Sequence, residues 1–194
     1  MAALKAGLAK IDITPPIGTL MGGYRNRQVG GEGVHDLLYS KALVLENGNN
    51  SNLAIVTSDL LGINRKSVDK IREKIIKRIS IDRDNILICA SHTHSGPDVL
   101  SLFSKRVDKR YLYELENKMI EVVCSAWGAR EKARVGIGKT EVEGVAYNRR
   151  LILKDGSVAH NFTNINEDMV EKRGPVDRTV GILNPNYALT GKRF

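Results

Sequence analysis

The chain has 194 residues, of which 42% are hydrophobic and 27% are charged, as expected for a globular protein that buries a core. No stretch approaches the roughly 20 apolar residues that cross a bilayer, and the first ten residues lack the apolar run of a secretory signal. We therefore expect a single soluble domain over residues 1–194, located in the cytoplasm.

The formal net charge of +8 raises the question of an anionic partner. The basic residues, however, are spread along the chain and are mostly interleaved with acidic ones, as in residues 70–77. A nucleic-acid-binding surface needs clustered Arg and Lys together with aromatic stacking residues, and aromatic residues make up only 5% of this chain. We therefore expect a solvated basic surface and no nucleic-acid partner.

The N-terminal half predicts loops followed by a hairpin. Glycines and prolines interrupt the first forty residues, apart from a short strand at residues 8–13. Two apolar runs follow at residues 42–45 and 53–56, and the turn signal Asn47-Gly48-Asn49-Asn50 lies between them. Such a turn between two strand patterns predicts an antiparallel hairpin.

A strand, a helix and a strand are predicted between residues 53 and 90. Apolar residues recur at three- and four-residue steps over 68–79 behind a possible Asn64 cap, and 86–90 is a buried-strand pattern. A crossover of this length lays its two strands parallel, with a right-handed connection, so that they end at the same edge of the sheet. Asp59 and His92 follow these strands, and we expect them to converge where open α/β sheets bind ligands.

The remaining elements complete an α/β prediction. A second amphipathic helix is expected over residues 112–126, capped by Asp108, ended by Gly128 and packed on the sheet. Shorter strands are expected at 133–138, 142–147 and 151–153, with a turn at Lys154-Asp155-Gly156, and no complete element is expected over 184–194. The fold class is therefore a mixed sheet with a parallel βαβ core flanked by helices.

His92 and His94 stand one residue apart, directly after a predicted strand and before Ser95-Gly96-Pro97. In an extended chain alternate side chains share a face, so both imidazoles can be directed at one ion or one substrate. Two histidines without a third ligand do not complete a zinc site. The spacing alone therefore leaves a metal site and a chance pair equally open.

Several segments carry a family resemblance: AGLAKIDITPP at residues 6–16, MGGY at 21–24, Ser58-Asp59, SHTHSGP at 91–97 and YNRR at 147–150. In order and spacing they resemble the neutral, non-lysosomal ceramidase family. The later KDG at 154–156 and GPVD at 174–177 resemble bacterial and archaeal ceramidase-like proteins. The resemblance implies that the chain is the N-terminal portion of a larger ceramidase-like catalytic domain.

The resemblance also implies a chemistry, namely zinc-dependent hydrolysis of the amide bond in an N-acyl, ceramide-like lipid substrate. It implies that His92 is a zinc ligand, that His94 handles a proton beside the zinc-bound water, and that Arg149 contacts the oxyanion or head group. Asp59 is a candidate to orient a metal-bound histidine, and the alternative is an aspartate that caps a turn. His35 and His160 match no motif of the family, and we expect them in solvent or loops.

In the family the other zinc ligands come from later sequence. The resemblance therefore implies that a second chain or a further C-terminal portion completes the site. The alternative is a truncated or non-catalytic ceramidase-like module with weak or no metal binding. Two motifs are each open to two interpretations. Residues 12–16 either end a strand and turn the chain, or form part of the active site. Residues 21–24 either provide a flexible backbone next to a ligand, or form a tight turn that carries a packed tyrosine.

Overall fold

The computed structural model describes residues 4–27, 29–48, 51–102, 107–161 and 164–187. The chain forms two compact units, of which the first comprises Met1–Arg134 with Asn186–Phe194 and the second comprises Val135–Pro185. The single domain expected over residues 1–194 stays a prediction, because a domain is defined by its ability to fold alone and a compact unit only by its internal contacts.

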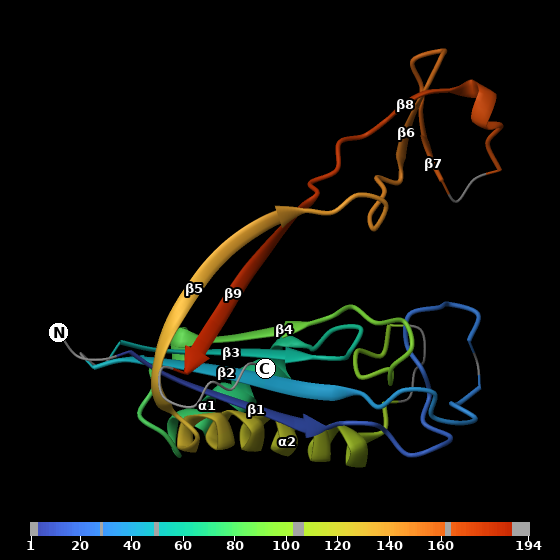
Figure 1. Ribbon diagram of the computed structural model, residues 1–194. Coiled ribbons are helices and arrows are strands. Elements are labelled where there is room, and N and C mark those ends of the chain that lie inside the picture. The colour runs from blue at the N-terminus through green and yellow to red at the C-terminus, as the bar shows by residue number, and fades with distance from the viewer. Residues whose placement is uncertain (1–3, 28, 49–50, 103–106, 162–163, 188–194) are drawn as a thin grey trace. The chain divides into compact units, whose positions relative to one another are not determined.

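The first unit is built on a mixed sheet (Figure 1). Strands β1 (Leu4–Asp12), β2 (Tyr39–Asn47) and β3 (Ser51–Ser58) are antiparallel neighbours, and β4 (Ile86–Ala90) pairs with β3 in parallel. The predicted hairpin is confirmed as β2 and β3, and the parallel pair that was predicted around the first helix is confirmed as β3 and β4. Beyond β1 the strand order continues with β5 (Glu131–Glu141) and β9 (Thr179–Tyr187), most of whose residues belong to the second unit.

Both helices of the first unit begin at the predicted caps. Helix α1 (Arg65–Ile76) starts after Asn64, whose side chain accepts a hydrogen bond from the Ser67 amide. Helix α2 (Lys109–Gly128) starts after Asp108, whose carboxylate accepts from the amides of Arg110 and Tyr111. These side chains satisfy amide donors that the first helical turn leaves without partners. A short 3-10 helix, η1 (Arg83–Asn85), precedes β4.

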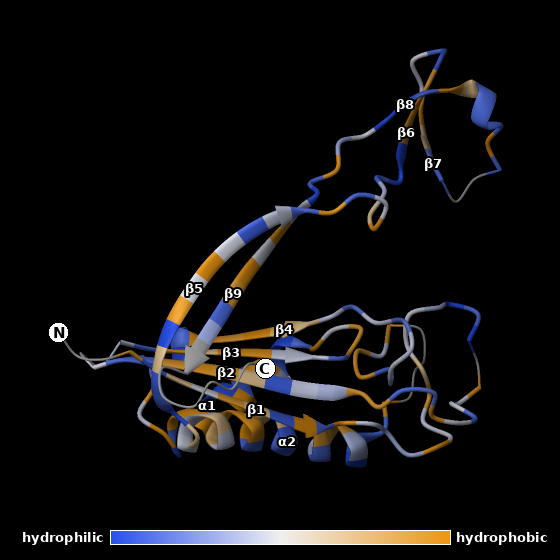
Figure 2. Ribbon diagram, in the orientation of Figure 1, coloured by the Kyte–Doolittle hydropathy of each residue, from blue (hydrophilic) through white to orange (hydrophobic). Residues whose placement is uncertain are grey.

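The core lies between one face of this sheet and the two helices. Alternate residues of the central strands are fully or almost fully buried, including Ala42 and Val44 on β2 and Ala54 and Val56 on β3. Helix α2 contacts β1, β2 and α1, and its colours alternate along the helix in Figure 2, as an amphipathic helix requires. The expectation that this helix packs on the sheet is confirmed.

The second unit carries a three-stranded antiparallel sheet in the order β7-β6-β8. Its strands are β6 (Arg150–Leu153), β7 (Val158–His160) and β8 (Val170–Arg173), and a 3-10 helix, η2 (Glu167–Met169), precedes β8. The turn predicted at residues 154–156 joins β6 to β7, and Gly156 has a φ of 81°, in the left-handed region that favours glycine.

One prediction for this part of the chain is wrong. Residues 142–147 form no strand, because Gly144 turns the chain with a φ of 75° and Val145 and Tyr147 are 77% and 70% exposed, so the alternating pattern there buries no face. At the C-terminal end, residues 184–187 form the end of β9, so the described part of the segment 184–194 contains no complete element, as expected. Residues 188–194 lie outside the described residues.

No helix within the described residues combines the length and apolar character that crossing a membrane requires.

Candidate functional site

The parallel pair β3 and β4 brings two chain segments together at one edge of the sheet. After the strands end, the Ser91 amide donates to Ser58 O at 3.0 Å and the Thr93 amide donates to Leu60 O at 3.2 Å. The segment after β3 therefore supports the segment that carries both histidines. The two segments therefore lie side by side, and the predicted convergence of the Asp59 and His92 side chains stays a prediction.

The His92 ring is oriented by a backbone carbonyl. Its Nδ1 lies 2.8 Å from Leu61 O, and because a carbonyl only accepts hydrogen bonds, the neutral form of the ring carries its proton on Nδ1 and its lone pair on Nε2. The backbone of His92 has a φ of 61°, a left-handed conformation that is uncommon for a residue with a side chain. Such backbone strain is found preferentially at functional sites.

His94 lies between two other rings. The centroids of the His92 and His94 rings are 5.0 Å apart with an interplanar angle of 74°, and the Tyr24 ring is 5.1 Å from His94 at 81°. The His92 side chain is exposed and that of His94 is half-buried. The structure therefore brings together the two histidines that the sequence singled out.

The segment around Met21-Gly22-Gly23-Tyr24 packs directly on the histidine loop. Met21 forms an isolated β-bridge with Pro97, and the Gly22 amide donates to Gly96 O at 2.9 Å. Gly23 has a φ of 99°, and a Cβ atom added to it would lie 2.6 Å from Cγ of His94. The backbone of this motif therefore lies next to His94, and the Tyr24 ring contacts His94 although Tyr24 is 55% exposed. Both interpretations of the motif stay predictions.

Arg27 joins the two segments and was not singled out from the sequence. Its Nη1 donates to His94 O at 2.8 Å and to Gly22 O at 3.2 Å, while the guanidinium carbon lies 4.9 Å from the Tyr24 ring centroid. The partners Arg27 and His94 are 67 residues apart in the sequence. No local pattern around Arg27 indicates this contact.

Asp59 lies at the same edge of the sheet, where its carboxylate bonds the backbone of Tyr39 and not a histidine ring. Its Oδ2 accepts a hydrogen bond from the Tyr39 amide at 3.0 Å, and its own amide donates to Tyr39 O at 2.9 Å. These bonds hold the end of β3 to the start of β2. The contact that orients His92 comes from Leu61 O instead, so the bonds of Asp59 are those expected of an aspartate that holds the chain at a strand end.

The segment that leads from β1 into the site is held by helix α2. The Tyr111 hydroxyl donates to Ile13 O at 2.5 Å, and burial raises the pKa of Tyr111, with a further contribution from the charge of Asp12. Hydrogen bonds from the Thr14 hydroxyl and amide hold the pKa of Asp12 below its usual value. These contacts support the interpretation of residues 12–16 as a structural strand end.

Arg149 lies in the second unit and is exposed. Its backbone carbonyl accepts from the Asn161 amide at 3.1 Å, and the preceding Asn148 bonds the Pro175 carbonyl and the Arg150 amide. These bonds fix the start of β6. The predicted contact of the Arg149 side chain with a substrate stays a prediction.

The other two histidines are exposed, as expected. His35 is 98% exposed and its Nδ1 lies 2.7 Å from Asp36 Oδ2, and His160 is on β7 of the second unit. Within the described residues, no group of three or more His, Cys, Asp or Glu side chains is arranged to hold a metal ion. His92, with Nε2 available, fits the role of one zinc ligand in a larger set.

Comparisons with known proteins agree with this fold and these motifs. The sequence profile of the family described as "Neutral/alkaline non-lysosomal ceramidase, N-terminal" matches residues 4–156. The neutral ceramidases of Drosophila melanogaster and Drosophila pseudoobscura pseudoobscura are each 30% identical to this chain over 105 residues, which are 50% of this chain and 14% of each relative. The chain thus corresponds to a small part of the length of these relatives.

Two solved structures share the fold over the whole chain. One is described as "Ceramidase complexed with C2", with a TM-score of 0.80, 22% identity and coverage of 30% of that chain. The other is the neutral ceramidase from Pseudomonas aeruginosa, with a TM-score of 0.75, 20% identity and coverage of 31% of that chain. Because the profile match spans most of the sequence, the chain belongs to the neutral/alkaline non-lysosomal ceramidase family.

Proposed function

We propose that this chain contributes part of the active site of a zinc-dependent amidohydrolase that cleaves the amide bond of an N-acyl, ceramide-like substrate. The observation that carries the proposal is the hydrogen bond between His92 Nδ1 and Leu61 O, which leaves Nε2 as a lone-pair donor at the exposed edge of the sheet. In metal sites, the ring nitrogen of a histidine that does not bind the metal usually donates a hydrogen bond to a carbonyl, a carboxylate or a water, and this bond fixes the orientation of the ring. Membership of the ceramidase family supports the same chemistry.

Each residue then has a defined task. His92 is the metal ligand of this chain, and a zinc ion held there with ligands from further polypeptide would supply a water of lowered pKa and polarise the amide carbonyl. His94 is proposed to accept or donate a proton beside the bound substrate, and the 5.0 Å between its ring centroid and that of His92 supports this role. Arg149 is proposed as a cationic contact for the oxyanion or head group, and Asp59 as support for the strand end that carries the site.

Hydrolysis of a fluorogenic N-acyl sphingosine in the presence of Zn²⁺ tests the proposal. We expect activity in a preparation that contains the completing polypeptide, and its loss, by at least a hundredfold, in His92→Ala, because one ligand of the ion is removed. His35→Ala is the matched control, since it removes an imidazole that is 98% exposed. Undiminished hydrolysis by His92→Ala would disprove the proposed role.

A second candidate is a ceramidase-like module that binds metal weakly and does not hydrolyse amides. The observation behind it is that His92 and His94 are two donors, and the described residues offer no group of three. Two imidazoles alone do not close a tetrahedral zinc site. Zinc that is removed by a weak chelator, together with no hydrolysis when the completing polypeptide is supplied, would favour this candidate over the first.

A further inference from the structure

The rings of His92 and His94 are oriented by different means, although the two residues are neighbours in the same loop. The His92 ring is held by the hydrogen bond between Nδ1 and Leu61 O. Among the residues that the structure describes, none forms a hydrogen bond with a ring nitrogen of His94, and the rings in contact with it are those of His92 and Tyr24. A group that transfers a proton needs a nitrogen that can reach the substrate. The orientation of the His94 ring therefore comes from packing.

The backbone on both sides of His94 is held in place. The Ser95 amide donates to the Thr93 hydroxyl oxygen at 3.1 Å, so this bond spans His94. The His94 carbonyl accepts from Nη1 of Arg27 at 2.8 Å, and the same nitrogen donates to Gly22 O at 3.2 Å. One guanidinium thus ties the backbone of His94 to that of Gly22.

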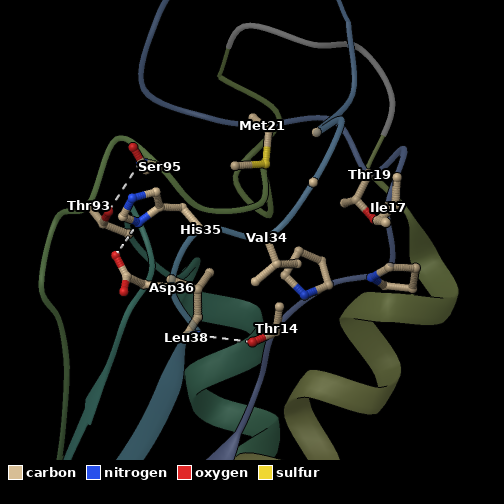
Figure 3. A pocket seen from close by; sticks show the side chains of 14 residues that line it. Thr14, Ile17, Thr19, Met21, Val34, His35, Asp36, Leu38, Thr93 and Ser95 are labelled. Atoms are coloured by element: carbon tan, nitrogen blue, oxygen red, sulfur yellow. Dashed lines mark hydrogen bonds and ion pairs between the residues drawn. The ribbon is translucent and has the colours of Figure 1, made fainter.

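Met21 and Tyr24 approach alternate residues of the loop after β4. Met21 lies with Thr93 and Ser95 around a pocket of about 370 Å³ (Figure 3). His94 is not among the residues that line this pocket, and its ring contacts Tyr24 instead, with the two centroids 5.1 Å apart and an interplanar angle of 81°. Such an edge-on arrangement is one that aromatic rings prefer at this distance.

The Tyr24 ring is held in turn by Arg27. The guanidinium carbon lies 4.9 Å from the ring centroid, within the range at which a cation and an aromatic face attract each other. Tyr24 is 55% exposed, so much of its ring is not held by packing, and the contact with Arg27 restricts it. The Gly23 backbone adds a further contact, because a Cβ atom placed there would lie 2.6 Å from Cγ of His94.

We propose that Tyr24 and Arg27 are positioning residues for His94. Arg27 acts on both ends of this histidine, on its carbonyl directly and on its ring through Tyr24. The pair restricts rotation of the ring without a hydrogen bond to its nitrogens. The consequence for proton transfer rests on the proposed function, whereas the restriction of the ring does not. Because a catalytic group displaced by about 1 Å can lose about a hundredfold in rate, this support should affect the chemical step.

Tyr24→Leu, in a preparation that contains the completing polypeptide, tests the proposal. The substitution removes the ring and keeps an apolar side chain. We expect kcat for a fluorogenic N-acyl sphingosine to fall about tenfold and KM to change less than about twofold, because the displaced His94 acts in the chemical step. Tyr24→Phe keeps the ring and should retain kcat. Tyr113→Leu is the matched control, since Tyr113 is 57% exposed on α2.

A double-variant cycle tests whether Tyr24 and Arg27 act through the same ring. Arg27→Lys keeps the charge, but an ammonium cannot bridge two carbonyls and also cover the Tyr24 ring. If each single variant lowers kcat about tenfold through His94, the double variant should also lose about tenfold, whereas independent effects would multiply to about a hundredfold. Arg25→Lys, at an exposed position, is the control for the arginine.

The order of the His94 side chain is measured separately from activity. The chain is labelled at histidine within the same preparation, and the χ1 couplings are recorded by NMR. Tyr24→Leu should average the couplings of His94, and Tyr24→Phe should leave them unchanged. His92, which Leu61 O holds, should keep its couplings in both variants and is the internal control. If Tyr24→Leu alters the spectrum as a whole, Tyr24→Met takes its place.

The outcomes separate this proposal from the proposed function. Averaged His94 couplings in Tyr24→Leu, together with no hydrolysis by the unsubstituted preparation, would overturn the proposed function and support the restriction of the ring. Hydrolysis with an unchanged kcat in Tyr24→Leu, equal losses in Tyr24→Phe and Tyr24→Leu, or unaltered His94 couplings would overturn the positioning role. Effects that multiply in the double variant would overturn the shared action of Tyr24 and Arg27.

Discussion

Gly23 and His94 lie so close together that a Cβ atom on Gly23 would be 2.6 Å from Cγ of His94. The φ of 99° at Gly23 is a second reason why a residue with a side chain is unfavourable there. Gly23 and His94 are 71 residues apart in the sequence. Their contact makes the conformation of one depend on the other.

Gly23→Ala is expected to displace the His94 ring and to lower the free energy of unfolding. The left-handed backbone alone costs about 1–2 kcal/mol for an alanine, and the clash with His94 adds to this cost. Urea unfolding gives the free energy, and the His94 side-chain NMR signals report the displacement.

Two glycine controls separate the two causes. Gly18→Ala meets a φ of 87° without any atom within 4 Å of the new Cβ, so it should show the backbone cost alone. Gly33→Ala meets neither a left-handed backbone nor a neighbour within 4 Å and should be close to neutral. Equal effects of Gly18→Ala and Gly23→Ala would mean that the contact with His94 adds no cost.

Arg27→Lys is expected to loosen the contact between the two segments although it keeps the positive charge. A lysine ammonium cannot bridge two carbonyls and at the same time cover the Tyr24 ring as the planar guanidinium does. Hydrogen exchange of the Gly22 amide, which donates to Gly96 O, should become about tenfold faster, as for the loss of one charge-assisted hydrogen bond. Arg25→Lys, at an exposed position nearby, is the control, and unchanged exchange in Arg27→Lys would contradict the bridging role.

Asp108→Ala should lower the free energy of unfolding by about 0.5–2 kcal/mol, because the amides of Arg110 and Tyr111 lose their acceptor. Chemical denaturation is the measurement. Glu121→Ala removes an exposed carboxylate from the middle of the same helix and should change the stability much less. Equal losses of unfolding free energy in Asp108→Ala and Glu121→Ala would show that the removal of a negative charge, and not the loss of the helix cap, causes the destabilisation.

The lowered pKa of Asp12 predicts that the folded state loses some stability in acid. Its pKa is lower in the folded chain than the value of 3.8 for an unperturbed aspartate, because Thr14 donates hydrogen bonds to the carboxylate. The ionised form therefore stabilises the fold above pH 3.8, and this stabilisation is lost as the pH falls through the folded-state pKa. Asp12→Asn should flatten the dependence of unfolding free energy on pH in this acidic range, and an unaltered slope would contradict the assignment.

Local patterns were sufficient to predict much of the first unit. Asn64 and Asp108 cap helices because short polar side chains before an apolar period satisfy the first amides, and this signal lies within a few residues of the helix start. The parallel pairing of β3 with β4 followed from the length of the crossover, and it placed the segments after both strands at one edge. The resemblance of the sequence motifs to those of the ceramidase family singled out His92 and His94 among the residues at this edge.

The remaining features depend on contacts between distant segments. The Leu61 carbonyl orients His92 from 31 residues away, and Arg27 reaches His94 over 67 residues, so neither partner has a local signature. The strand predicted at residues 142–147 was wrong for a related reason, because an alternating pattern predicts a strand only where one face becomes buried.

The central claim is that His92 binds zinc through Nε2. The most direct measurement is a Zn²⁺ titration in a preparation that contains the completing polypeptide, followed by the imidazole ¹⁵N signals of this chain, with His92→Ala, His94→Ala and His35→Ala in parallel. The account predicts a zinc-dependent shift of Nε2 in His92, loss of this binding in His92→Ala, and retained binding in His94→Ala and His35→Ala. Unchanged zinc binding in His92→Ala, or coordination of His92 through Nδ1, would contradict it.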